Sequence, residues 1–100
     1  MARRSFAGRT VLVTGAGGGL GRAIAMRFAQ AGARVAALDK DTTGLESLGV
    51  EIEGRGGQCL ALPCDITDAE ACNQAVAATL RRFGTLDVLV NNAGMSQRSG

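Results

Sequence analysis

Thr10-Val11-Leu12-Val13-Thr14-Gly15-Ala16-Gly17-Gly18-Gly19-Leu20-Gly21 is the stretch of sequence that decides the fold. A run of β-branched and aliphatic residues, typical of a buried strand, ends abruptly at a glycine-rich turn, and a helical pattern begins directly after it. Glycine has no Cβ and lets a phosphate approach the backbone, while the free N–H groups of a helix N-terminus attract negative charge. A strand, a glycine turn and a helix in this order are typical of dinucleotide-binding proteins.

The spacing of the glycines excludes two known kinds of phosphate-binding turn and leaves others open. The G-x-G-x-x-G pattern fails because Leu20 stands where the third glycine is required, and no Gly-Lys-Ser/Thr follows, which excludes a P-loop. A glycine-rich turn in another kind of α/β protein remains an alternative. Two other patterns do fit the sequence: Gly15, Gly19 and Gly21, or Gly15, Gly18 and Gly21.

Composition indicates a globular chain without nucleic-acid or membrane partners. Its 100 residues are enough for one small domain at most, and 46% are hydrophobic while 20% are charged. The net charge is +2 and the basic residues are scattered, so no nucleic-acid stripe or basic membrane patch is predicted. No apolar run is long enough to span a bilayer. The Arg3-Arg4 pair is interpreted as a solvated lead-in, because the apolar stretch after it is too short for an export signal.

The cysteines follow no metal-binding pattern, and no metal site is predicted. Cys59, Cys64 and Cys72 are interpreted as small core residues of a protein in the reducing cytoplasm. Cys59 and Cys64 are expected on opposite sides of a strand.

Strand-like and helix-like stretches alternate along the whole chain. This alternation predicts an α/β fold, a Rossmann-like doubly wound parallel sheet with strand order 3-2-1-4. The spacing of apolar residues predicts that Leu20, Ala23, Ile24 and Phe28 face the core from the first helix. The corresponding residues are Leu45, Leu48 and Ile52 in the second, and Cys72, Val76, Leu80 and Phe83 in the third. Thr42 or Thr43 is expected to cap the second helix and Asp68 the third. Strands are predicted over 10–14, 34–38, 58–62 and 86–90, and helices over 19–31, 42–54 and 69–83.

Asp39 lies where the second strand ends, at the sheet edge where ligands of doubly wound folds bind. A carboxylate there can accept hydrogen bonds from both hydroxyls of an adenosine ribose and would repel a 2′-phosphate. The sequence therefore favours NAD over NADP, although the neighbouring Lys40 could partly neutralise a phosphate. The alternative is that Asp39 only forms the turn at the strand end.

Two further polar stretches follow the third and fourth strands. Asp65 could accept from an adenine amino group while Ile66 packs on the ring, or Asp65 could simply organise the turn into the next helix. Asn91-Asn92-Ala93-Gly94 would be read as a turn if it stood alone. Its amides can tie neighbouring loops together, and its small residues leave room beside a ligand.

Taken together, the glycine turn, Asp39, Asp65-Ile66-Thr67-Asp68 and Leu86-Asp87-Val88-Leu89-Val90-Asn91-Asn92-Ala93-Gly94 resemble the short form of the short-chain dehydrogenase/reductase family. The resemblance implies NAD(P)-dependent hydride transfer between an alcohol and a ketone, by a protein that is a homo-oligomer when complete. It also implies the site residues. The pyrophosphate and ribose would be lined by Gly15, Gly18, Gly19, Leu20 and Gly21, the adenosine ribose held by Asp39, the adenine met by Asp65 and Ile66, and the nicotinamide-side ribose met by Asn92 and Ala93.

The catalytic machinery of that family is missing from the sequence. The family uses a Tyr, a Lys four residues later and a Ser, whereas this chain has no Tyr, and its one Lys is Lys40. Ser96 and Ser99 come too early to be the family's Ser. No catalytic residue is therefore predicted, and residues 1–100 are interpreted as the N-terminal part of a single NAD(P)-binding domain. The alternatives are a non-catalytic dinucleotide-binding module, an interaction module, and a part of an NADP-dependent reductase.

Overall fold

The computed structural model describes residues 5–95 and confirms the alternating order of strands and helices. The Arg3-Arg4 lead-in, Ser96 and Ser99 lie outside the described residues. The fourth strand is shorter than predicted and is followed by a helical turn that the sequence did not indicate. The elements are β1 Thr10–Thr14, α1 Gly19–Gln30, β2 Arg34–Asp39, α2 Thr42–Gly54, β3 Gln58–Pro63, α3 Ala69–Phe83, β4 Val88–Val90 and α4 Asn92–Met95.

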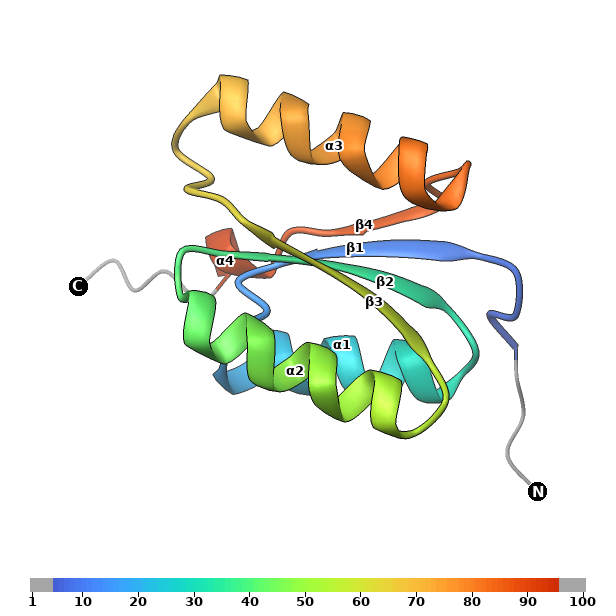
Figure 1. The fold of residues 1–100 in the computed structure, drawn as a ribbon. Helices are drawn as coiled ribbons and strands as arrows, with labels where there is room; N and C mark the ends of the chain where they lie inside the picture. The colour runs from blue at the N-terminus through green and yellow to red at the C-terminus, as the bar shows by residue number, and fades with distance from the viewer. Residues whose placement is uncertain (1–4, 96–100) are drawn as a thin grey trace.

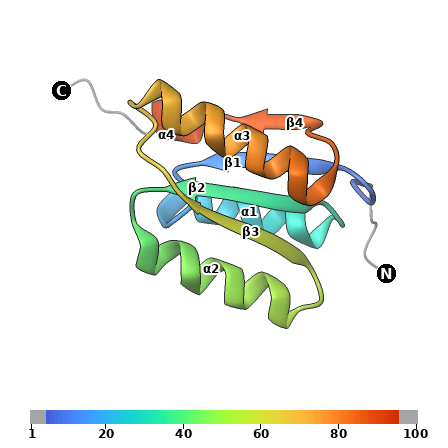
Figure 2. The ribbon, with the colours of Figure 1, turned by 45° about the horizontal axis from the view of Figure 1, so that its top comes forward.

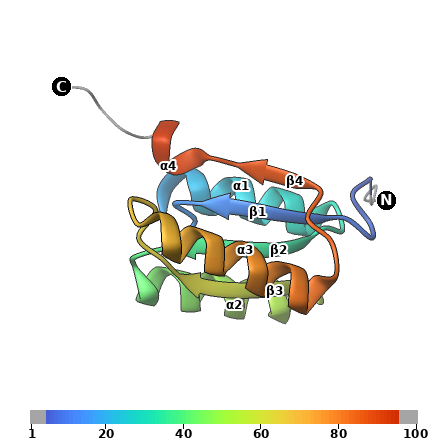
Figure 3. The same ribbon diagram turned by 90° about the horizontal axis from the view of Figure 1, so that it is seen from above.

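The four strands form one parallel sheet in the order β3-β2-β1-β4. Figure 3 shows them side by side and pointing in the same direction, so that all their carboxyl ends lie at one edge. This arrangement confirms the predicted Rossmann-like fold and its strand order. It also brings together, at that edge, the segments that follow each strand.

The helices cover both faces of the sheet, with α1 and α2 on one face and α3 on the other (Figures 1 and 2). β1 is completely buried between these layers. Val11 and Val13 pack into the core on the α1 and α2 face, whereas Leu12 belongs to the core on the α3 face. Cys59 and Cys64 also lie in different cores, as predicted, although Cys72 is only partly buried.

The predicted buried face is right for α2 and only partly right for α1 and α3. Leu45, Leu48 and Ile52 of α2 are fully buried. In α1 the predicted Ile24 and Phe28 pack against the core and are partly buried, but the fully buried residues are Gly21 and Ala25, and Leu20 is 57% exposed. The bulky stripe misled the prediction because this helix approaches the sheet through small residues.

The error in α3 has the same form. Ala75, Thr79 and Phe83 are buried, of which only Phe83 was predicted, and the apolar Val76 and Leu80 are exposed. Thr79 satisfies its buried hydroxyl by donating to the carbonyl oxygen of Ala75, 2.8 Å away. None of the helices within residues 5–95 combines the length and apolar character that crossing a bilayer requires.

Aspartate side chains cap the N-termini of α2 and α3. The side chain of Asp41, and not Thr42 or Thr43, caps α2 by accepting from the Gly44 N–H. Asp68 caps α3 as predicted, accepting from the N–H groups of Glu70 and Ala71.

Asp87 explains why β4 is shorter than predicted. Its carboxylate accepts from the Thr10 N–H at 2.8 Å, and its own N–H donates to the Thr10 carbonyl oxygen at 2.9 Å. Asp87 thus pairs with the first residue of β1 before the regular strand begins at Val88.

Burial of Cys59 makes the free energy of unfolding pH-dependent in the alkaline range. Desolvation, with a smaller contribution from Glu53, raises the pKa of the Cys59 thiol from 9.0 to about 11. As pH rises through this interval, the thiol ionises in the unfolded chain but stays neutral in the folded one. The free energy of unfolding is therefore expected to fall by up to about 1.4 kcal/mol per pH unit through this residue. Urea unfolding of Cys59→Ala should lack this contribution, and an identical pH dependence in the variant would contradict it.

Candidate functional site

The turn between β1 and α1 presents exposed backbone at the carboxyl edge of the sheet. Gly15 and Gly19 have φ values of +67° and +58°, which side chains other than glycine rarely adopt. Gly18, Gly19 and Leu20 are exposed. No side chain caps α1, and its first turn contains no acidic residue. The N-terminus of α1 is therefore open to an anion from solvent.

Gly21 lets α1 pack directly against the end of β1. A Cβ atom at this position would overlap the carbonyl oxygen of Gly15 and come within 2.6 Å of Asn92 Nδ2. The same Asn92 Nδ2 donates to the Gly15 carbonyl oxygen at 3.4 Å. The turn is thus held by backbone contact from one side and by an amide from the other.

Asp39 connects the end of β2 to the glycine turn. Its Oδ2 accepts from the Gly17 N–H at 2.8 Å, and its Oδ1 accepts from the Asp41 N–H at 3.0 Å. The residue is half-buried. Because a carboxylate oxygen can accept more than one hydrogen bond, both oxygens retain capacity for a further donor.

The segment after β4 is tied to β1 by Thr14. The Ala93 N–H donates to Thr14 Oγ1 at 3.1 Å, and that hydroxyl lies 3.2 Å from Asn91 Oδ1. Asn92 is 3% exposed, and its Oδ1 has no hydrogen-bond partner among residues 5–95. Buried oxygens are nearly always paired, so this acceptor indicates a place for a donor that residues 5–95 do not provide.

Asp65 and Ile66 lie one strand further along the same edge and are both exposed. The turn is fixed to β2 because the Cys64 N–H donates to the Asp39 carbonyl oxygen at 2.9 Å. Asp65 Oδ1 accepts from the hydroxyl of Thr67 at 2.7 Å and from its N–H at 3.0 Å. These two bonds, with a smaller effect of Lys40, hold the pKa of Asp65 below its usual value. The carboxylate therefore has the turn-organising role that the sequence left open, and its second oxygen stays available.

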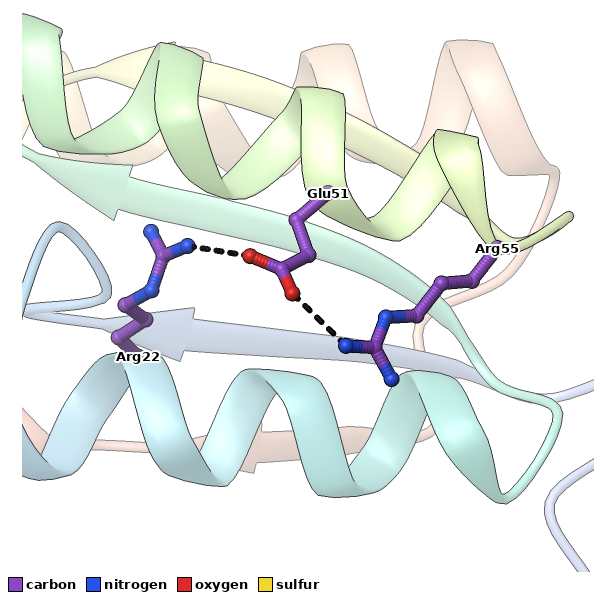
Figure 4. A network of polar contacts seen from close by, with 3 residues as sticks. All are labelled: Arg22, Glu51 and Arg55. Carbon is purple, nitrogen blue, oxygen red and sulfur yellow. Dashed lines mark hydrogen bonds and ion pairs between the residues drawn. The ribbon is translucent and has the colours of Figure 1, made fainter.

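An ion-pair network joins α1 and α2, the two helices that cover one face of the sheet (Figure 4). Glu51 of α2 accepts from Arg22 of α1 at 3.0 Å and from Arg55 at 2.8 Å. All three side chains are partly exposed, so each pair contributes at most about 1 kcal/mol. The network links the first turns of α1 to the end of α2.

The structure brings the predicted site residues to one edge of the sheet and shows two further residues, Thr14 and Gly17, among their hydrogen bonds. Hydrogen bonds link Gly15 to Asn92 and Asp39 to the turn, whereas Asp65 and Ile66 stand at the neighbouring strand end. Thr14 and Gly17 take part in these links but were given no role from sequence. Thr14 is a polar residue in an otherwise apolar strand, which could have indicated it, but Gly17 carries no such signal within a run of glycines.

A cavity of about 480 Å³ lies away from this edge, beside the end of α2. None of the sequence-predicted site residues lines it, although Ile52 of the core and Arg55 of the ion-pair network do. The lining residues are Met26, Ala29, Gln30, Ile52, Arg55, Gly56 and Gly57.

The contact at Gly21 can be tested against its neighbour Gly18. We expect Gly21→Ala to lower the free energy of unfolding by about 2 kcal/mol or more, because the new methyl group overlaps backbone. A Cβ at Gly18 meets nothing within 4 Å, so Gly18→Ala should cost less than about 1 kcal/mol. Denaturant unfolding measures both, and equal effects would show that the close approach at Gly21 is not limiting.

Comparison with known proteins gives the same family throughout. The family model described as short chain dehydrogenase matches residues 9–100. A D-threitol dehydrogenase of Mycolicibacterium smegmatis is 41% identical over 90 residues, which cover 90% of this chain and 35% of that protein. The chain thus spans about a third of the length of the curated relatives it matches.

Solved structures of the same family superpose closely on the fold. A 7α-hydroxysteroid dehydrogenase complexed with NADH and 7-oxo glycochenodeoxycholic acid has a TM-score of 0.86 and 34% identity, over 90% of this chain and 35% of that one. A metagenomic short-chain oxidoreductase in complex with NADP has a TM-score of 0.80 and 34% identity, over 85% and 38%. Both cofactors therefore occur among the structural relatives. The strand order, the glycine turn and the match over nine-tenths of the sequence agree, and the chain belongs to the short-chain dehydrogenase family of oxidoreductases, which bind a nicotinamide dinucleotide.

Proposed function

We propose that this chain forms the adenosine half of the cofactor site of an NAD-dependent oxidoreductase that interconverts an alcohol and a ketone. The observation that carries the proposal is the Asp39 carboxylate, held beside the glycine turn by the Gly17 N–H. In this assignment Asp39 accepts from the adenosine ribose hydroxyls. Its two oxygens are already oriented by backbone donors, so binding requires little reordering of the side chain.

Charge at this position supports NAD over NADP. A 2′-phosphate would stand close to the half-buried Asp39 carboxylate and would be repelled. The glycine turn has Gly18, not Arg or Lys, in the position before Gly19 and so offers no cation to balance the phosphate. Lys40 is exposed, and a charge facing solvent compensates little.

The other proposed cofactor contacts lie along the carboxyl edge of the sheet, on both sides of β1. We assign the pyrophosphate and its ribose to the backbone of Gly15, Gly18, Gly19, Leu20 and Gly21. The adenine is assigned to Asp65 and Ile66, whose side chain is 37% exposed and free to cover a ring. Asn92 and Ala93, on the other side of the turn, are assigned to the nicotinamide-side ribose.

The residues present fit such a cofactor. Asn92 Oδ1 has no partner within the described part of the chain, and a ribose hydroxyl is a donor of suitable size for it. The open N-terminus of α1 provides N–H groups for a pyrophosphate. When bound, the nicotinamide ring donates or accepts the hydride of the reaction.

We place the proton donor of the reaction outside this chain. Protonating a carbonyl oxygen requires a general acid near the nicotinamide, and the sequence has no Tyr or His. Its one Lys, Lys40, follows the adenosine-side residue Asp39. Residues 1–100 therefore act, in this proposal, as the N-terminal part of a single cofactor-binding domain.

Asp39→Ala in the longest protein that the gene encodes tests this proposal. We expect the dissociation constant of NAD to rise by about tenfold to a hundredfold, because hydrogen bonds to a charged group are lost. NADP binding should stay the same or become tighter, since the repulsion is removed. Calorimetric titration with both cofactors measures the ratio.

Asp68→Ala is the matched control for this experiment. Asp68 also accepts two backbone N–H groups at a strand-to-helix turn, but it caps α3 and has no assigned cofactor contact. The Asp68→Ala variant should be less stable, but the ratio of its dissociation constants for NAD and NADP should not change. An unchanged ratio in Asp39→Ala would remove the ribose assignment, and a wild-type preference for NADP would favour an NADP-dependent reductase.

A further inference from the structure

Gly44, at the start of α2, is in direct contact with the glycine turn. A Cβ atom built on Gly44 would overlap the carbonyl oxygen of Gly17 and approach Asp41 Oδ2 to 2.8 Å. Gly44 has no positive φ, so the backbone conformation alone does not require glycine here. The requirement is for space, and what occupies that space is the backbone of the glycine turn.

The contact closes a ring of interactions. The Gly17 N–H donates to Asp39 Oδ2, Asp39 Oδ1 accepts from the Asp41 N–H, and Asp41 Oδ1 accepts from the Gly44 N–H. Gly44 then packs back on the carbonyl of Gly17, the residue at which the ring began. The segment 39–44 therefore holds both backbone polar groups of Gly17. Asp39 accepts a hydrogen bond from its N–H, and Gly44 packs against its carbonyl oxygen.

We propose that Gly44 is a positioning residue for NAD, which sets where the glycine turn and the Asp39 carboxylate stand relative to each other. This role rests on the proposed cofactor site and adds to it a residue of a helix that has no assigned cofactor contact. A methyl group at position 44 must push the turn and α2 apart. Asp39 accepts from the Gly17 N–H of the turn and from the Asp41 N–H just before α2, so separating the two strains one of these bonds and shifts the ribose acceptor relative to the pyrophosphate backbone.

Gly49 shows that the effect belongs to position 44 and not to glycine in α2. Glycine weakens a helix relative to alanine at both positions. A Cβ at Gly49 meets nothing within 4 Å, whereas a Cβ at Gly44 meets backbone. Gly49→Ala is therefore a control in the same helix, with the same chemical change and a free surface to receive it.

The experiment compares wild type, Gly44→Ala and Gly49→Ala in the longest protein that the gene encodes. Calorimetric titration with NAD and with NADP is combined with thermal unfolding, and the ¹H–¹⁵N spectrum follows the Gly17 amide. We expect Gly44→Ala to weaken NAD binding by about tenfold to a hundredfold, because the ribose hydrogen bonds to a charged group are lost or strained. NADP should weaken less, because it gains nothing from Asp39, and the Gly17 amide should shift. Gly49→Ala should melt at a higher temperature with wild-type affinities and an unshifted Gly17 amide.

The possible outcomes separate this proposal from the one it rests on. If wild type binds neither cofactor, the proposed function fails. If wild type binds NAD and a folded Gly44→Ala binds it equally well, or if both cofactors weaken in the same proportion, the positioning role is overturned.

A second variant applies if Gly44→Ala does not fold. Asp41→Ala removes the acceptor of the Gly44 N–H without adding bulk and releases the first turn of α2. It should weaken NAD severalfold and NADP less, and an unchanged NAD affinity would again overturn the proposal.

Discussion

Close contact between backbone atoms at the end of β1 is the constraint on which the rest of the structure depends. α1 meets the Gly15 carbonyl through Gly21, and α2 meets the Gly17 carbonyl through Gly44. Neither contact tolerates a Cβ, so the turn sets how closely each helix can approach the end of β1, and buried side chains such as Leu45 and Leu48 then hold it there. The small residues on the buried face of α1 continue this close approach along the helix, with Ala25 fully buried against the sheet.

Polar groups then fix the strand ends that the close contacts bring together. Asp39, Asn92 and Thr14 each bond to backbone of a neighbouring segment, over distances of 2.8 to 3.4 Å. Most of these bonds are partly buried, where an unpaired donor or acceptor is costly. The exception is the Asn92 Oδ1, and its isolation is consistent with an edge built to receive a ligand.

The sequence predicted the fold well because its strongest signals are local. Alternating strand and helix patterns, with glycine at the turns, define a parallel sheet, and the strand order follows from the connections. The buried faces of α1 and α3 were predicted only in part because hydrophobic size was taken as the sign of burial, whereas Gly21, Ala25 and Ala75 are buried for being small. Asp39 and Asn92 were found through their place at strand ends. Gly44 was given no role from sequence, because its contact with Gly17, 27 residues away in the chain, is encoded by no local pattern.

The two backbone donors held by Asp39 have a consequence for how such a site can change during evolution. Replacing the carboxylate by an apolar or basic side chain alters the charge at the edge and, in the same step, leaves the N–H groups of Gly17 and Asp41 without their acceptor. A lineage that exchanges this side chain must therefore also supply new acceptors, or reshape the glycine turn so that water reaches both donors. Charge at this strand end and the architecture of the turn are thus inherited as one unit, and substitutions at positions 17, 39 and 41 should be found together.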